Sequence, residues 1–446
     1  MRRVATAVLR IVARIFFRRI EIVGEERVPR DGTPVIFAVN HPNALIDPLF
    51  LLCFAPRPVS FLAKAPLFRM PLISWFVRGF ESIPVYRRED NFSPEQNRET
   101  FGRSRQTLAR GGAIAIFPEG TTHSESRLKT LKTGAARIAL GSTLPRVLVI
   151  PTGLFYTAKQ TFRSAAVMYF GAPIEVAPIR VDDDGEPPRE AVEALTKQIE
   201  ASLAEVTVQA DSRAALDLIS RADRIFRLGR GDLADALEMR KRFVAGYRWL
   251  CEHDPARLAR VQSRIERFES ELGAANLEPA ELVPPTFIGS VKTIATLLVM
   301  LPLALAGAIV HYPIYRLIGA VVTKAGSDEE LVATQKAVGG LVLYPLIWLA
   351  VAGFVWWRFG WPFALAALVV VPFLGYIALR FGEQLDGVVG RARAITWRVA
   401  RSRAYARLLV QQRAIHDEIV ALNDVMARSD RASDSPAAAT RSSPPG

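Results

Sequence analysis

The sequence is poor in cysteine. Only two occur in 446 residues, Cys53 and Cys251, and each lies in an apolar or helical pattern. Two isolated thiols do not make a disulfide framework, so the chemistry is expected to face a reducing compartment. No cysteine and histidine cluster has zinc spacing, and neither a metal nor a cofactor is expected. A Gly-x-Ser-x-Gly turn is also lacking, so no covalent serine nucleophile is expected.

Acidic residues are in deficit. Asp and Glu number 44 against 57 Lys and Arg, a formal net charge of 57 − 44 = +13. This surplus suits a polyanionic partner, either nucleic acid or an anionic membrane surface. Because 50% of the chain is hydrophobic, the membrane is favoured. The arginines lie beside apolar segments and not in an aromatic-interleaved β-surface, so we expect no nucleic-acid partner.

Residues 1–20 contain six arginines and no acid. On a helical wheel the arginines gather on one side and the apolar residues on the other, which predicts a basic amphipathic helix in the membrane interface. Arg10 and Arg14 interrupt the apolar run, which argues against a cleaved signal peptide. The alternative is a helix that packs on its own domain.

Short apolar runs alternate with helical patterns over residues 21–210. We predict an α/β domain with a mostly parallel sheet flanked by helices. The predicted strands are Val35–Val39, Ala113–Phe117 and Val147–Pro151, and the predicted helices include Asn97–Arg110, Lys132–Leu140 and Arg189–Val206.

Residues 211–285 are charged and helical in pattern, and Asp254-Pro255 interrupts them. Aspartate suits a helix cap and proline the first helical turn, so we predict an antiparallel helical pair that links two larger parts.

Residues 286–380 hold the predicted membrane segments. Val338–Trp357 and Trp361–Leu379 are uncharged and are joined by three residues, so they predict a tight transmembrane hairpin. Thr293–Val310 carries Pro302, and we expect it either to be re-entrant or to pair with the apolar run Ile314–Val322.

Arginines follow the last apolar segment closely, which predicts that the basic helical tail, residues 381–428, is cytosolic. The catalytic domain would then face the cytosol in an integral membrane protein, in the inner membrane if the source is bacterial. Residues 429–446 are rich in Ser, Ala, Pro and Arg, a composition typical of disorder.

The strongest chemical signal is Asn40-His41-Pro42-Asn43-Ala44-Leu45-Ile46-Asp47-Pro48, directly after the first predicted strand. A carboxylate that holds one imidazole nitrogen protonated leaves the other nitrogen free to accept a hydroxyl proton. We expect Asp47 at a helix cap, outside the helix because Pro48 follows it, with a turn that brings it back to His41. The alternative is a surface histidine near a capping aspartate.

Three further segments follow. Phe117–Ser124 offers backbone and hydroxyl donors to an anion after another predicted strand. Gly79–Arg88 ends in two arginines, which bind phosphate well but more often form a solvated patch. Val149–Gly153 on its own indicates only a core strand and turn.

In this order, the four segments resemble the four blocks of the PlsC-type glycerolipid acyltransferases, and the resemblance covers residues 21–210. It implies that His41 is the catalytic base, that Asp47 is its partner, and that Pro151 shapes the acyl-donor side. Four residues are implied to bind the glycerol-phosphate portion of the acceptor: Arg87, Glu119, Gly120 and Thr121.

Five residues separate His41 from Asp47, where the family usually has four. The longer spacing resembles the fungal-type glycerol-3-phosphate acyltransferases, which also have hydrophobic segments after the catalytic domain. The resemblance implies acyl-CoA or acyl carrier protein as donor, and glycerol-3-phosphate or 1-acyl-glycerol-3-phosphate as acceptor. The alternatives are a membrane-tethered esterase or thioesterase, or a lipid-binding protein without activity. The sequence leaves the oligomeric state open.

Overall fold

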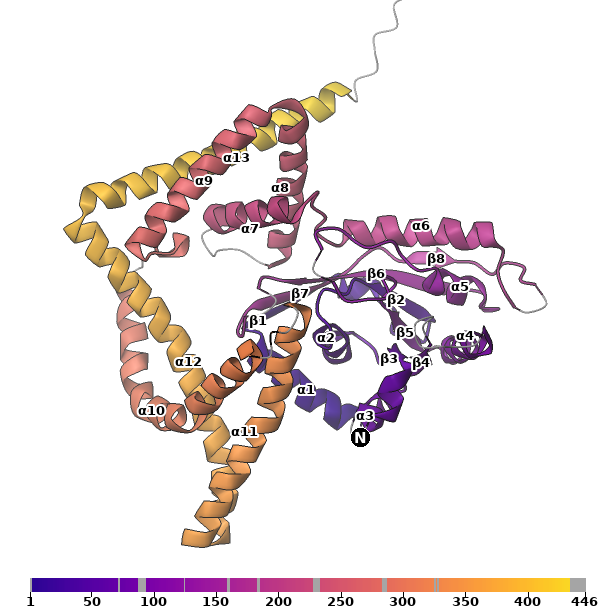
Figure 1. Cartoon of the computed structure of the whole chain (residues 1–446), viewed down its shortest axis with the longest axis horizontal. Coiled ribbons are helices and arrows are strands. Elements are labelled where there is room, and N and C mark those ends of the chain that lie inside the picture. The colour runs from indigo at the N-terminus through magenta and orange to yellow at the C-terminus, as the bar shows by residue number, and fades with distance from the viewer. Residues whose placement is uncertain are drawn as a thin grey trace, which may run out of the picture. The chain divides into compact units, whose positions relative to one another are not determined.

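The computed structural model forms two compact units, which are described separately (Figure 1). The first unit comprises Met1–Gln209 and Leu303–Ala378, and the second comprises Ala210–Pro302 and Leu379–Gly446. The structure describes residues 2–70, 73–86, 94–123, 125–158, 161–182, 185–227, 233–282, 287–324, 326 and 329–433.

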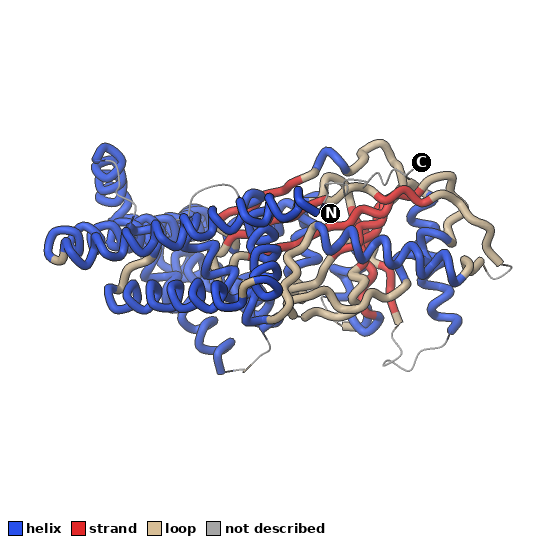
Figure 2. Tube along the Cα trace, turned by 90° about the horizontal axis from the view of Figure 1, so that it is seen from above, coloured by secondary structure: helices blue, strands red, loops and turns tan. Residues whose placement is uncertain are grey.

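The first unit is built on an eight-stranded, mostly parallel sheet, whose strands are red in Figure 2. The strand order is β1-β7-β6-β2-β5-β3-β4, and β8 also pairs with β6. Among the strands that the structure describes, only the β6–β7 and β6–β8 pairs are antiparallel. The predicted α/β class is confirmed. The strands are β1 (Arg19–Val23), β2 (Val35–Val39), β3 (Val59–Lys64), β4 (Ile83–Val85), β5 (Ala113–Ile116), β6 (Val147–Tyr156), β7 (Ala165–Phe170) and β8 (Ile174–Val176).

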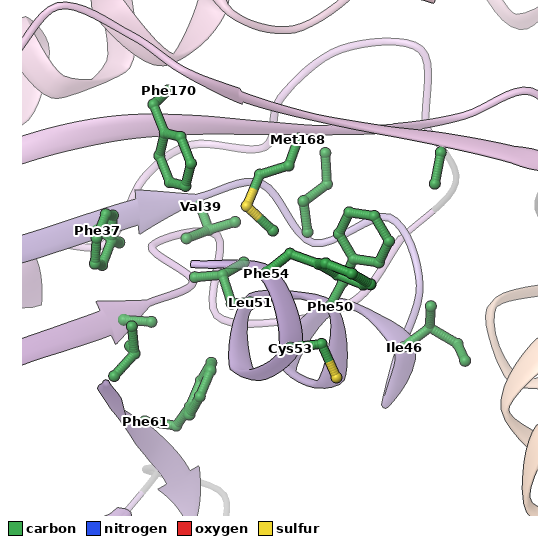
Figure 3. Packing of buried hydrophobic residues seen from close by; sticks show 14 of the residues in the cluster. Phe37, Val39, Ile46, Phe50, Leu51, Cys53, Phe54, Phe61, Met168 and Phe170 are labelled. Atoms are coloured by element: carbon green, nitrogen blue, oxygen red, sulfur yellow. The ribbon is translucent and has the colours of Figure 1, made fainter. Parts of the chain in front are cut away.

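Helices cover both faces of the sheet, which is why β2 is an uninterrupted apolar run. Phe37 and Val39 of β2 pack on the face that carries α2, where Phe50, Met168 and Phe170 join them (Figure 3). The alternate residues of β2 pack on the opposite face, against α4, α5 and α6. These helices are α2 (Ile46–Phe54), α4 (Pro94–Ala109), α5 (Gly134–Leu140) and α6 (Arg189–Glu205).

The amino-terminal helix α1 (Arg2–Phe16) has both a packed and an exposed apolar face. Phe16 is buried in the sheet core, and the Arg10 guanidinium donates to the Cys53 carbonyl of α2 over 2.9 Å. The opposite face leaves four apolar side chains exposed: Val4, Val8, Ile11 and Ile15. The helix therefore packs on its own domain and still presents an apolar stripe. Short α3 (Ile73–Gly79) precedes β4.

Three helices are long and apolar enough to cross a membrane by length and composition, within the residues described. They are α10 (Phe287–Lys324), α11 (Glu329–Phe359) and α12 (Trp361–Ala400), with apolar windows of mean hydropathy 2.1 to 2.3. The expectation for Thr293–Val310 was wrong, because it and Ile314–Val322 form one continuous helix. The α11–α12 hairpin turns at Gly360, whose φ of 95° suits glycine.

His311 of α10 joins the three apolar helices within the first unit. Its Nδ1 lies 2.9 Å from the Gly307 carbonyl, and its Nε2 accepts a hydrogen bond from the Trp348 indole of α11 over 2.9 Å. On α12, a Cβ at Gly375 would lie 2.5 Å from His311 Nε2. The absence of a side chain at Gly375 thus lets α12 pack closely against the hydrogen-bonded pair of His311 and Trp348, which joins α10 and α11.

The second unit is helical and differs from the predicted pair in residues 211–285. It has three helices in that stretch, α7 (Arg213–Arg227), α8 (Leu233–His253) and α9 (Pro255–Ala275), and α13 (Ser402–Ser433) packs with them. The predicted break is present, because Asp254 caps α9 and accepts from the Arg257 amide over 2.8 Å. The predicted tail begins inside α12, and α13 extends to Ser433, into the stretch expected to be disordered. Residues 434–446 lie outside the description.

Gly153 of β6 is predicted to tolerate no side chain, because a Cβ there would lie 1.9 Å from the Val206 carbonyl oxygen. Gly153→Ala should lower the free energy of unfolding by about 1–3 kcal/mol, the usual effect of overpacking. Gly134→Ala in α5 is the control, since no atom lies within 4 Å of its added Cβ. Thermal unfolding of both variants decides the point, and equal melting temperatures would contradict the predicted clash.

Candidate active site

His41 and Asp47 meet beyond the carboxyl end of β2, the central strand between β5 and β6. The His41 Nδ1 lies 2.8 Å from Asp47 Oδ2. The turn expected between them is present, but Asp47 lies inside α2, which begins at Ile46 with Leu45 as its cap. The expectation that Pro48 keeps Asp47 out of the helix was wrong. The Asp47 amide bonds back to the Asn43 carbonyl over 3.1 Å, and proline is tolerated in a first helical turn.

The Asp47 carboxylate is fully buried and accepts three hydrogen bonds. His41 and the Asn43 amide bond Oδ2, the latter over 2.7 Å, and the Tyr156 hydroxyl donates to Oδ1 over 2.7 Å. Burial raises the pKa of Asp47, and the bonds from His41, Tyr156 and Asn43 act in the opposite direction. Burial and the neighbouring Asp47 charge raise the pKa of Tyr156 well above 10, so Tyr156 stays protonated and donates.

This arrangement sets the tautomer of His41. An ionised Asp47 accepts at Oδ2, so the Nδ1 of His41 carries the proton and Nε2 keeps its lone pair. The His41 ring also stacks on Phe117, with 4.1 Å between ring centroids and 21° between planes. The His41 side chain is 15% exposed, whereas that of Asp47 is 0% exposed. The imidazole of His41 is thus held at its Nδ1 edge, and part of the ring stays accessible to solvent.

A second buried carboxylate holds the backbone of His41. Glu119 Oε1 accepts from the His41 amide over 3.0 Å, and the His123 amide donates to the His41 carbonyl over 3.3 Å. Glu119 Oε2 accepts from the Lys129 amide over 3.0 Å and contacts His123 Nε2. The loops that follow β2 and β5 are therefore joined at both peptide groups of His41.

Glu119 is 3% exposed, and both of its oxygens bond to groups of the protein. Burial alone would raise the pKa of Glu119, but the hydrogen bonds from His123, Lys129 and His41 outweigh it, and the pKa lies below its ordinary 4.5. The sequence resemblance predicted that Glu119 binds the glycerol-phosphate acceptor. The structure places it between the two loops, and contact with the acceptor stays a prediction.

The turn after Glu119 carries the other predicted anion-binding residues. Gly120 has φ of 72°, and its amide donates to the Phe117 carbonyl over 3.0 Å. The Lys132 side chain lies across this glycine, because a Cβ at Gly120 would lie 2.7 Å from Lys132 Nζ. Thr121 is exposed beside it. The turn thus combines an exposed hydroxyl with an ammonium group that the sequence reading did not single out.

Pro151 and Arg87 are the two predicted site residues not yet considered. Pro151 is buried within β6 and pairs with Ala38 of β2, with its carbonyl accepting from the Gly171 amide over 2.8 Å. Arg87 and Ser124 lie outside the described residues. In the part of the chain that is described, no three His, Cys, Asp or Glu side chains gather as metal ligands would.

Sequence reasoning missed three supporting residues. Asn40 bonds both the amide and the carbonyl of Leu154, over 2.6 and 3.0 Å, and so fixes the loop after β2 to β6. His123 contacts Glu119, and Tyr156 donates to Asp47. The spacing of Glu119 and His123, four residues apart, was a usable signal. Tyr156 had none, because it is 109 residues from Asp47 in sequence.

Comparison with known proteins identifies the domain. Residues 19–154 match the family model "Acyltransferase". The matched residues contain β1 to β5, most of β6 and the His41–Asp47 pair, and this stretch is thus an acyltransferase domain of the PlsC type.

Among individual proteins, the chain is similar to fungal and plastid acyltransferases. An uncharacterized acyltransferase of Schizosaccharomyces pombe is 24% identical over 84% of this chain and 73% of its own length. Glycerol-3-phosphate O-acyltransferase 2 of Saccharomyces cerevisiae is 24% identical over 78% of this chain, which spans 64% of that protein. The chloroplastic 1-acyl-sn-glycerol-3-phosphate acyltransferase LPAT1 of Arabidopsis thaliana is 29% identical over 32% of this chain and 38% of its own length. The fungal similarity extends well beyond the catalytic domain, which fits the fungal-type variant.

We predict that Glu119→Gln destabilises the protein in a pH-dependent manner. Because the folded-state pKa of Glu119 is lowered, its ionised form stabilises the fold above pH 4.5, and this contribution is lost as pH falls through the folded pKa. The variant should lose about 1.5–3 kcal/mol of unfolding free energy at pH 7, the range for hydrogen bonds to a charged group. Denaturant unfolding at pH 7 and pH 4 measures the difference. A gap between wild type and variant that does not narrow at pH 4 would contradict the assignment.

Proposed function

We propose that the chain transfers a fatty acyl group from an acyl thioester to a hydroxyl of a glycerol-phosphate acceptor. The main support for this proposal is the geometry of His41. Its ring is partly accessible and is held at Nδ1 by the buried carboxylate of Asp47. The names of the similar proteins, which include glycerol-3-phosphate and 1-acyl-glycerol-3-phosphate acyltransferases, support the reaction class. The donor is a thioester of coenzyme A or of acyl carrier protein.

The proposed chemistry is direct transfer. His41 Nε2 takes the proton of the acceptor hydroxyl, and the oxygen attacks the thioester carbonyl carbon. The carbon–sulfur bond then breaks, an ester remains, and the leaving thiolate takes the proton from the imidazolium. Asp47 stabilises the imidazolium, and Tyr156 and the Asn43 amide hold Asp47 in place.

The membrane part of the proposal rests on exposed apolar surface. We place the α11–α12 hairpin across the bilayer, with the apolar stripe of α1 at its surface and both the catalytic domain and the basic tail on the cytosolic side. Trp356, Trp357 and Trp361 flank the hairpin turn and are exposed, as aromatic residues at a membrane interface are. The site would thereby lie at the membrane surface, where the acyl chains of the substrates partition.

We predict a graded loss across the His41 network. His41→Ala should lower kcat by about 10² to 10⁴-fold, the usual contribution of a general base. Tyr156→Phe removes one hydrogen bond to Asp47 and should lower kcat about 10-fold, with acceptor KM unchanged.

The measurement for this network is ester formation from labelled acyl-CoA by purified protein, with donor hydrolysis without acceptor followed in parallel. Full-rate hydrolysis without acceptor would indicate a thioesterase. Wild-type rates for His41→Ala would remove the base from the mechanism.

We predict that Arg87 binds the acceptor phosphate, an expectation from sequence alone. Arg87→Ala should raise the acceptor KM about 10- to 100-fold, the effect of losing hydrogen bonds to a charged group, with donor KM unchanged. Arg88→Ala is the matched control from the next position. An unchanged acceptor KM for Arg87→Ala would remove Arg87 from the site, and Lys132 beside Gly120 would be the next cation to test.

A further inference from the structure

Asn43 is a buried amide without a hydrogen-bond partner for its side chain. It is 1% exposed, and neither its Oδ1 nor its Nδ2 bonds to any residue that the structure describes. Buried side-chain amides are normally paired, as Asn40 nearby is with both polar groups of Leu154. Asn43 lies within the loop between His41 and Asp47, which makes it an unusual place for unpaired polar atoms.

The backbone of Asn43 is fixed firmly beside the candidate base. Its amide donates to Asp47 Oδ2, the same oxygen that His41 Nδ1 contacts, and its carbonyl accepts from the Asp47 amide. Only one carboxylate oxygen therefore separates the Asn43 backbone from the His41 ring. The side-chain amide belongs to the most tightly held part of the site, so its lack of partners is not a consequence of a loose loop.

A buried donor and acceptor without partners are costly, so their presence calls for an explanation, and beside a candidate base that explanation is a ligand that supplies the missing groups. The Asn43 amide needs an acceptor for Nδ2 and a donor for Oδ1. Hydroxyl groups offer both functions, whereas acyl chains and thioesters offer no donor.

We propose that Asn43 binds the hydroxyl of the acceptor that neighbours the reacting one, an inference that rests on the proposed function. Glycerol-3-phosphate carries two vicinal hydroxyls. His41 takes the proton of one, and the Asn43 amide pairs with the other. In 1-acyl-glycerol-3-phosphate the second oxygen is esterified and has no proton, so Oδ1 would stay unpaired. Asn43 therefore directs the site to glycerol-3-phosphate.

The test removes each partner of the contact in turn. Wild type and Asn43→Ala are assayed for kcat/KM with glycerol-3-phosphate and with 3-hydroxypropyl phosphate, which lacks the neighbouring hydroxyl. The acceptor 1-acyl-glycerol-3-phosphate is the third arm. Asn423→Ala in α13, which belongs to the second unit, makes the same chemical change and is the control. Thermal unfolding of each protein checks that the fold is intact.

Sites built to bind a hydroxyl discriminate strongly against analogues that lack it. Wild type should therefore prefer glycerol-3-phosphate over 3-hydroxypropyl phosphate by about 10-fold or more. Asn43→Ala should lose about 10- to 100-fold on glycerol-3-phosphate and stay within about 2-fold of wild type on 3-hydroxypropyl phosphate. Its melting temperature should not fall, because the side chain loses no hydrogen bond.

Equal losses of Asn43→Ala on both acceptors would overturn the proposal, since they would assign Asn43 to support of the loop. Faster wild-type turnover of 1-acyl-glycerol-3-phosphate than of glycerol-3-phosphate would also overturn it and leave the proposed function standing. Transfer to none of the three acceptors by wild type would instead remove the proposed function itself. Should Asn43→Ala fail to fold, the wild-type preference between the two small phosphates decides alone.

Discussion

The site depends on one carboxylate that is removed from water. An ionised carboxylate inside a protein is unfavourable unless donors surround it, and Asp47 is supplied by a ring nitrogen, a phenol and a backbone amide. Each donor comes from a fixed position. His41 follows β2, Tyr156 ends β6, and the parallel register that pairs Val39 with Thr152 brings these two strand ends to one edge of the sheet. The sheet thus orients the imidazole through Asp47.

Glu119 complements this arrangement from the neighbouring loop. Asp47 bonds the side chain of His41, whereas Glu119 bonds its amide, so the ring and the backbone are held by different carboxylates. The two acids respond differently to burial. At Asp47 the effect of burial exceeds that of the hydrogen bonds, and the pKa is raised. At Glu119 the hydrogen bonds exceed the effect of burial, and the pKa is lowered. Glu119 therefore stays ionised over a wide pH range and keeps the two loops joined.

The sequence predicted correctly those strands and turns that depend on residues close together in the chain. The apolar runs predicted β2, β5 and β6, and the turn expected between His41 and Asp47 predicted that these two side chains would meet. It did not reach contacts between residues distant in sequence, such as Tyr156 with Asp47. It also gave proline too much weight, because the bond from the Asp47 amide to Asn43 starts the helix one residue before Asp47. The number of helices predicted for residues 211–285 was wrong. The charged helical pattern there is interrupted twice and not once, so it forms α7, α8 and α9.

The apolar helix α11 packs against the same unit that carries His41 and Asp47. Ala333 of α11 is 0% exposed in the core on the α2 face of the sheet, and the Thr334 hydroxyl accepts from the Leu45 amide over 3.2 Å. Leu45 caps α2, the helix that contains Asp47. An unpaired amide at the start of a helix needs such a partner, and here the partner lies 289 positions away in sequence. The apolar helix α11 therefore helps to fix the turn that holds Asp47 against His41.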